Sequence, residues 1–89
     1  MRRRIQLIQC SGNALRWARG MSKLAQVVLA RYPGAWFHLG EQPTEAVVVV
    51  PDLVWNRETE VFFSGLCRSG YIEEFVHRSY SDWPEGVTR

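Results

Sequence analysis

One segment of this 89-residue chain combines residue types that could carry out chemistry, because a cysteine and an arginine bound a short polar turn. It reads Cys10-Ser11-Gly12-Asn13-Ala14-Leu15-Arg16 and lies between an apolar run and a long periodic segment. A tight turn at a helix N-terminus points backbone amides at an anion and favours the thiolate form of a nearby cysteine. An arginine one turn into the helix can grip a phosphoryl group through two hydrogen bonds. The pattern is that of a phosphate site with Cys10 as nucleophile and Arg16 as ligand.

These seven residues resemble the phosphate-binding loop of the low-molecular-weight protein tyrosine phosphatases, which has the form Cys-x-Gly-Asn-x-x-Arg and follows the first strand. The resemblance implies that Cys10 attacks the phosphoryl group, that Gly12 and Asn13 shape the loop, and that Arg16 holds the phosphate. It covers these seven residues alone.

The chain departs from that family at two places. Trp17 stands where the family has a hydroxyl residue, and Asp82 is separated from Pro84, whereas the family has an adjacent Asp-Pro pair as general acid. The alternative interpretation is that Cys10 ends a buried strand and Arg16 is an exposed helix residue. We favour this alternative and expect that the protein is not an enzyme.

A second pattern is a basic stripe formed by Arg16, Arg19 and Lys23, which would share one face of a helix. No acidic residue is interleaved, so the stripe lacks the intrahelical ion pairs that commonly accompany a solvated face. Trp17 and Trp36 are the nearest aromatic candidates for an anchor. The stripe and these two tryptophans are the predicted partner-binding residues.

Charge is divided between the two halves of the chain. Residues 2–31 carry no carboxylate, whereas all nine carboxylates fall between Glu41 and Glu85, and the net charge is only +2. So small a net charge is not typical of general nucleic-acid binders. No stretch is long and apolar enough to span a bilayer, so we expect a cytoplasmic protein with no membrane partner. Cys10 and Cys67 are expected to be free thiols, and no spacing indicates a metal site or a cofactor.

The elements that must position these residues follow from periodicity. Alternation predicts a first strand over residues 4–9, and apolar residues three and four apart predict a helix over 13–32, capped by Ser11 or Asn13. Gly20 lies inside that helix, where it is best tolerated if something packs close to the helix backbone. Strands are expected at 35–39 and at the four-valine run of 46–50, which should be central because it shows no alternation.

The second half admits two interpretations. The preferred one is a helix opened by residues 56–59 and closed by Ser69-Gly70, then a strand over 71–78. This gives β-α-β-β-α-β, an α+β ferredoxin-like domain over residues 1–78 with an antiparallel sheet and both helices on one face. The runner-up is β-α-β-β-β-α, with a hairpin at 53–63 and a last helix near 70–80. Residues 79–89 are expected to form a tail, from which Trp83-Pro84 can dock back on the body.

These observations favour a small protein-interaction module, a regulator or inhibitor that binds a larger protein assembly through the basic helix face and aromatic anchors. The chain is short for a core and a deep pocket together. A homodimer is a further possibility. The alternatives are the cysteine-dependent phosphatase and, less favoured, a nucleic-acid-binding protein.

Overall fold

The order of helices and strands follows the preferred interpretation. The structure, a computed structural model, describes residues 4–16, 18–85 and 87. Its elements are β1 (Ile5–Ser11), the 3₁₀ turn η1 (Asn13–Leu15), α1 (Ala18–Arg31), β2 (Trp36–Leu39), β3 (Glu45–Pro51), α2 (Arg57–Arg68) and β4 (Glu74–Tyr80). The predicted order β-α-β-β-α-β is confirmed, and the runner-up with a hairpin at 53–63 is wrong because residues 57–68 are helical.

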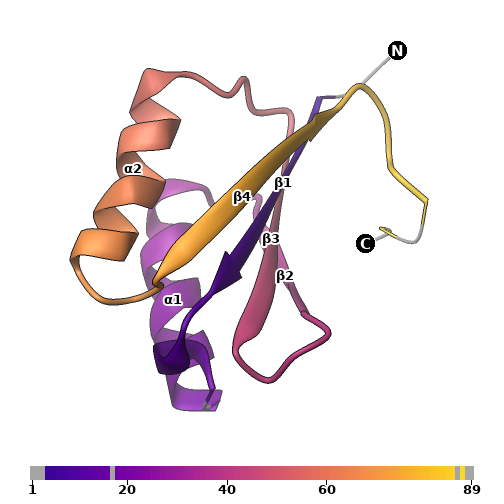
Figure 1. The fold of residues 1–89 in the computed structure, drawn as a ribbon. Helices are drawn as coiled ribbons and strands as arrows, with labels where there is room; N and C mark the ends of the chain where they lie inside the picture. Colours follow the sequence, from indigo (N-terminus) through magenta and orange to yellow (C-terminus); the bar gives the residue numbers. More distant parts are fainter. Residues whose placement is uncertain (1–3, 17, 86, 88–89) are drawn as a thin grey trace.

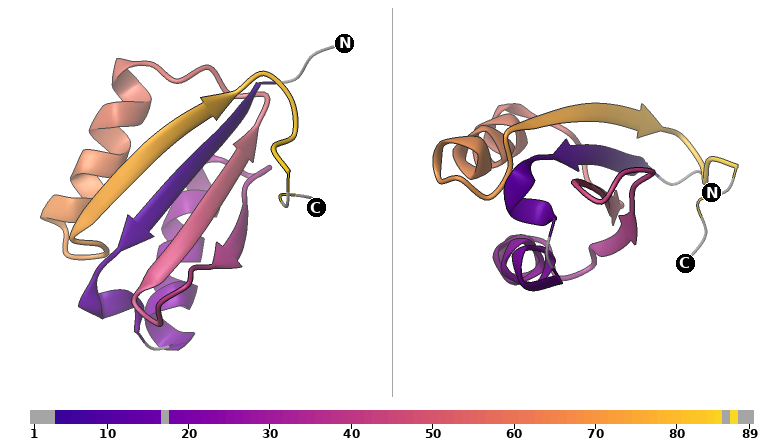
Figure 2. Two further views of the ribbon diagram at one scale, coloured as in Figure 1. Left: turned by 45° about the vertical axis from the view of Figure 1, so that its right-hand side comes forward. Right: turned by 60° about the horizontal axis from the view of Figure 1, so that its bottom comes forward.

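The four strands form one antiparallel sheet in the order β2-β3-β1-β4. Both helices cover one face of this sheet, and the other face is open (Figure 1; Figure 2). This is the expected α+β ferredoxin-like arrangement. The four-valine run lies in β3, between β1 and β2, so its predicted central position is confirmed.

The core lies between the sheet and the helices. Val48 of β3 pairs with Ile8 of β1, and both are fully buried on the face that the helices cover. Leu24 of α1 and Phe63 of α2 close the core from the other side, also with no exposed surface. Burying each such side chain contributes about 1.5–3 kcal/mol, and this burial is what holds α1 and α2 in place.

The start of the first helix differs from the sequence prediction. The chain makes the 3₁₀ turn η1 after Gly12, and α1 begins only at Ala18, so neither Ser11 nor Asn13 caps it. η1 folds against the helix, where a Cβ built on Gly20 would lie 1.7 Å from the carbonyl oxygen of Ala14. The expectation that something packs close to the helix backbone at Gly20 is therefore confirmed. Arg16 lies before α1 instead of within it.

The second helix begins and ends where the sequence predicts. The Asn56 side chain accepts from the backbone N–H of Thr59 at 3.0 Å, and the Thr59 hydroxyl accepts from the N–H of Asn56 at 3.3 Å. This reciprocal capping satisfies two amides that the first turn leaves without helical partners. Beyond Ser69, Gly70 adopts a φ of 83°, which favours glycine and turns the chain toward β4.

The C-terminal segment packs on the open face. β4 continues to Tyr80, two residues past the expected end of the domain at 78. After β4, Trp83 stacks on Trp36 of β2 with ring centroids 5.1 Å apart, so the expected docking of Trp83 is confirmed. Trp36 lies opposite Val49 in the sheet register, and Val49 is fully buried although it faces away from the helices.

Candidate functional site

The structure encloses the cysteine of the predicted phosphate site. Cys10 lies within β1, has no exposed surface, and directs its thiol toward the carbonyl oxygen of Ile8 at 3.8 Å. Burial, with a smaller contribution from Cys67, raises the pKa of the Cys10 thiol to about 12. A neutral, enclosed thiol is a poor nucleophile, because the thiolate is the reactive form.

The other parts of that predicted site are not assembled around Cys10 either. No α-helix begins at Asn13, so the turn lacks the amides and the dipole of a helix N-terminus. Arg16 is exposed at the end of η1, whereas the Cys10 side chain faces the core. The described residues therefore do not form the phosphate cradle that the resemblance implies. The alternative interpretation differs from the structure in two details, because β1 continues one residue past Cys10 and Arg16 lies before α1.

A groove lies where the start of α1 meets the turn between α2 and β4. It has a volume of about 600 Å³. Its lining comes from η1, from the first two turns of α1 and from the turn that follows α2. We call it the basic groove, and its lining residues are Ala14, Arg19, Gly20, Lys23, Ser69, Gly70 and Tyr71.

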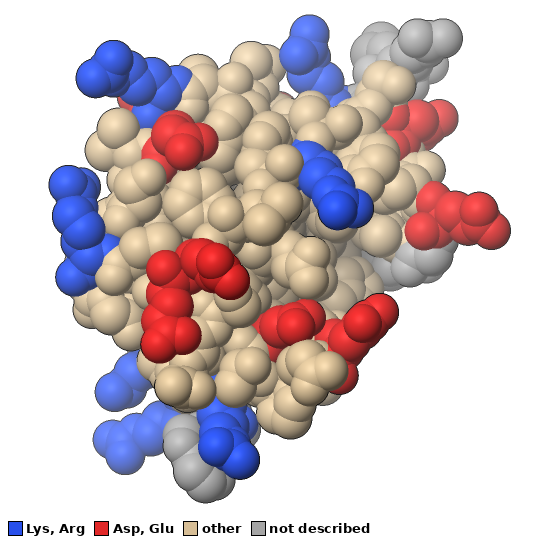
Figure 3. Space-filling model, in the orientation of Figure 1, with Lys and Arg blue, Asp and Glu red and all other residues tan. Residues whose placement is uncertain are grey.

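Both charged residues of the basic groove are cations without partners. Arg19 and Lys23 are exposed, one helical turn apart on α1, and their side chains form no ion pair or hydrogen bond with any residue that the structure describes. Arg31, at the other end of α1, differs because Glu58 of α2 lies 3.7 Å from it. Figure 3 shows Lys and Arg gathered at the lower end of the molecule, where α1 begins in Figure 1. This end of the molecule therefore attracts anions.

The walls of the basic groove are held by backbone contacts. The backbone N–H of Tyr71 donates to the carbonyl of Leu66 at 3.0 Å, and the next residue, Ile72, is buried in the core. The N–H of Glu73 donates to the carbonyl of Ser11 at 2.8 Å, which ties the turn after α2 to the end of β1. Tyr71 is thus a half-buried aromatic residue on a turn held by backbone hydrogen bonds, and it lines the same groove as Arg19 and Lys23.

The predicted partner-binding residues separate into three groups. Arg19 and Lys23 lie together in the basic groove, and Arg16 is exposed near its η1 side but is not part of the helix. Trp36 lies on the open face of the sheet, away from α1, where its ring stacks on Trp83 and its Nε1–H donates to His38. The structure therefore does not bring Trp36 to the basic stripe. Trp17 lies outside the described residues.

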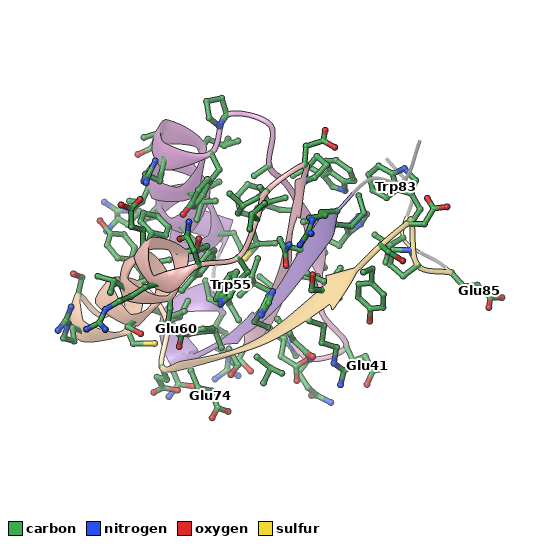
Figure 4. All side chains as sticks on the ribbon, turned by 90° about the horizontal axis from the view of Figure 1, so that it is seen from above. Glu41, Trp55, Glu60, Glu74, Trp83 and Glu85 are labelled. Atoms are coloured by element: carbon green, nitrogen blue, oxygen red, sulfur yellow. The ribbon has the colours of Figure 1, made fainter. Side chains whose placement is uncertain are left out.

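A second polar cluster links β1, β4 and α2 on the face of the sheet that the helices cover. The rings of Trp55 and His77 stack with centroids 3.7 Å apart, and the Trp55 indole N–H donates to Glu60 at 3.2 Å (Figure 4). Gln6, almost fully buried, donates to the carbonyl of Leu53 at 2.6 Å and accepts from His77 Nε2 at 2.6 Å. The bond to Leu53 fixes the orientation of the Gln6 amide, so that its oxygen faces His77. An amide oxygen can only accept, and His77 therefore carries its hydrogen on Nε2.

The surroundings of His77 favour its neutral form. Desolvation lowers the pKa of His77 below its usual 6.5, and the carboxylate of Glu60 opposes that shift. No buried side-chain nitrogen or oxygen among the described residues lacks a hydrogen-bond partner. The buried polar atoms of the cluster are thus satisfied by one another, and their hydrogen bonds hold β1, β4 and the segment before α2 together.

Comparison with known proteins adds no assignment, because no protein-family model, curated protein or solved structure matches this chain. Within the described part of the chain, no three His, Cys, Asp or Glu side chains are grouped so that they could hold a metal ion. In the same residues, neither helix has the length and apolar character required to cross a membrane.

Proposed function

We propose that this protein is a small interaction module, a regulator or inhibitor that binds an acidic segment of a larger protein in the basic groove. The observation that carries the proposal is the pairing of two unpartnered cations, Arg19 and Lys23, with the aromatic ring of Tyr71 on one fixed groove. Arginine binds a carboxylate through two parallel hydrogen bonds, lysine adds a second positive charge, and tyrosine supplies contact area at low entropic cost.

The charges around the groove favour a short acidic peptide over a nucleic acid. Glu73 and Glu74 lie two and three residues after Tyr71 and are both exposed, so the positive surface is bounded by negative charge on the β4 side. Figure 3 shows acidic residues beside the basic end of the molecule. A duplex brings a continuous row of phosphates, which would run past the cations and onto these carboxylates. A peptide with two or three carboxylates can be held within the basic groove alone.

The proposal is tested with a fluorescent peptide that carries three glutamates and one tryptophan, by measuring anisotropy at low salt. We expect binding that the double change Arg19→Glu with Lys23→Glu removes, mainly through slower association, while the melting temperature is nearly unchanged. The matched control is Arg57→Glu with Arg68→Glu, because these exposed cations lie on α2, outside the groove, and change the net charge equally.

Two outcomes would oppose the proposal. Equal losses in the groove variant and the control variant would mean that the peptide senses net charge alone. Tighter binding to an unrelated DNA duplex than to the peptide, with a steep linear fall of log affinity against log salt, would favour the nucleic-acid alternative.

A further inference from the structure

Among the described residues, the sheet ends at β4, a long strand whose outer edge pairs with no other strand. β4 has seven residues and pairs only with β1, whereas the opposite edge strand, β2, has four residues. Figure 2 shows β4 as the outer strand of the sheet. Residues 74–80 make no backbone hydrogen bond with any described residue other than those of β1. An edge of this kind is a template for pairing with another chain.

The side chains along this edge form a self-complementary pattern. The register with β1 places Glu74, Val76 and Arg78 on the open face of the sheet, and Phe75 and His77 on the helix face. Val76 is 52% exposed and lies between residues of opposite charge. Among the described residues, Glu74 accepts one side-chain hydrogen bond, from the Ser11 hydroxyl at 3.3 Å, and Arg78 has no ion-pair partner. Figure 4 shows Glu74 at the start of β4.

We propose that two copies of this chain pair through β4, antiparallel about a two-fold axis at Val76, and so join their sheets into one. Val76 then faces the partner's Val76. Glu74 faces the partner's Arg78, and Arg78 faces the partner's Glu74, so each ion pair occurs twice. A two-fold axis repeats every contact in this way, and opposite charges directly across two strands stabilise the pairing.

The pattern selects this register over its neighbours. Two residues that face each other across antiparallel strands have their side chains on the same face of the sheet. In two identical strands, such residues are an even number of positions apart, so the two-fold axis passes through a residue. Shifting the pairing of the two strands by one residue is therefore excluded. An axis at Phe75 would leave only three residues of each strand paired. An axis at His77 would align all seven residues, but it would put Arg78 opposite the partner's Val76 and His77 opposite the partner's His77. Only the axis at Val76 matches charge with charge.

The contact involves about five residues from each chain, so the dimer is expected to be weak and concentration-dependent. It does not use the basic groove, which lies on α1 and the turn after α2. Variants of the groove and variants of the edge can therefore be judged separately.

The experiment measures mass against protein concentration by sedimentation equilibrium, with the full chain. We expect a monomer–dimer equilibrium that Val76→Lys abolishes, because this change sets like charges side by side at the axis. The matched control is Val61→Lys. Val61 is also 52% exposed but lies on α2, so this variant should dimerise like the unchanged protein. Circular dichroism checks that both variants fold.

Charge reversal tests the register itself. Glu74→Arg or Arg78→Glu alone should raise the dimer dissociation constant about tenfold, since each change converts two attractive pairs into two repulsive ones. Glu74→Arg combined with Arg78→Glu should restore dimerisation, because each new arginine again faces a glutamate. A chain that stays monomeric at about 1 mM, equal effects of Val76→Lys and Val61→Lys, or no restoration in the double reversal would overturn the proposal.

Discussion

Gly20 and Gly65 are helical glycines for which the structure predicts opposite responses to the same substitution. Glycine in a helix interior costs about 0.5–1 kcal/mol relative to alanine, because it gives the unfolded chain more freedom. Around Gly65 of α2, no atom beyond the adjacent residues and the neighbouring helix backbone lies within 4 Å of the position that a Cβ would occupy. Gly65→Ala should therefore raise the free energy of unfolding by about 0.5–1 kcal/mol.

At Gly20 the same gain is opposed by a clash with the backbone of η1. An alanine Cβ there would lie 1.7 Å from the carbonyl oxygen of Ala14 and 2.8 Å from its carbonyl carbon, whereas ordinary contacts begin near 3.4 Å. The obstacle is backbone, so η1 itself must move away from the helix. Overpacking of this kind costs about 1–3 kcal/mol, and we expect Gly20→Ala to lower the free energy of unfolding by about 1–2 kcal/mol after the helical gain is counted.

Urea unfolding followed by circular dichroism measures both changes on one scale. Because Gly20 and Ala14 line the basic groove, Gly20→Ala should also weaken binding of the acidic peptide, whereas Gly65→Ala should leave it unchanged. If Gly20→Ala proved as stabilising as Gly65→Ala, η1 could not pack on α1 as described, and the geometry of the groove would be incorrect.

Three further predictions concern Val48, Cys10 and His77. Val48→Asp should abolish the cooperative unfolding transition seen by circular dichroism, because it places an unpaired charge at a position with no exposed surface. Cys10, with a pKa of about 12, should resist iodoacetamide at neutral pH until the chain unfolds, and the protein should not hydrolyse an aryl phosphate. Rapid labelling of Cys10 in the folded protein, together with turnover of the phosphate, would favour the phosphatase alternative. The folded state lowers the pKa of His77, so its stabilising contribution should be complete above pH 6.5 and decline as the pH falls toward the lower folded-state pKa. Between pH 8 and pH 5, the free energy of unfolding should fall more steeply in the unchanged protein than in His77→Phe. Identical slopes of this free energy against pH would contradict the prediction.

The long elements could be predicted because their signals are local. The valine run of β3 has no polar face, and Asn56 with Thr59 forms a reciprocal cap that is readable from residue types alone. The sequence predicts the end of β1 at residue 9, two residues too early, because Ser11 looks like a turn residue. In the structure Ser11 pairs with Glu45 on one side and Glu74 on the other, so two neighbouring strands extend β1 past the local turn signal.

The candidate site could be predicted only in part, because it depends on contacts between distant segments. Arg19 and Lys23 were found from their spacing on one helix. Tyr71 was missed, because nothing local indicates that the turn after α2 lies beside the start of α1. Closeness in sequence predicts Trp36 on the same surface, yet strand alternation places it on the face of the sheet opposite the helices.

Tertiary structure also explains why Arg19 and Lys23, at the start of α1, have no ion-pair partner among the described residues, whereas Arg31 at its end has one. The end of α1 approaches α2, where Arg31 meets Glu58 and Tyr32 packs edge-on against Phe62 with centroids 5.3 Å apart. At the start of α1, the neighbouring turn contributes Ser69, Gly70 and Tyr71, none of which carries a negative charge. Cations left without an internal partner cost little in solvent, but they lower the barrier to association with an acidic partner. The asymmetry between the two ends of one helix is therefore a physical reason to place binding in the basic groove.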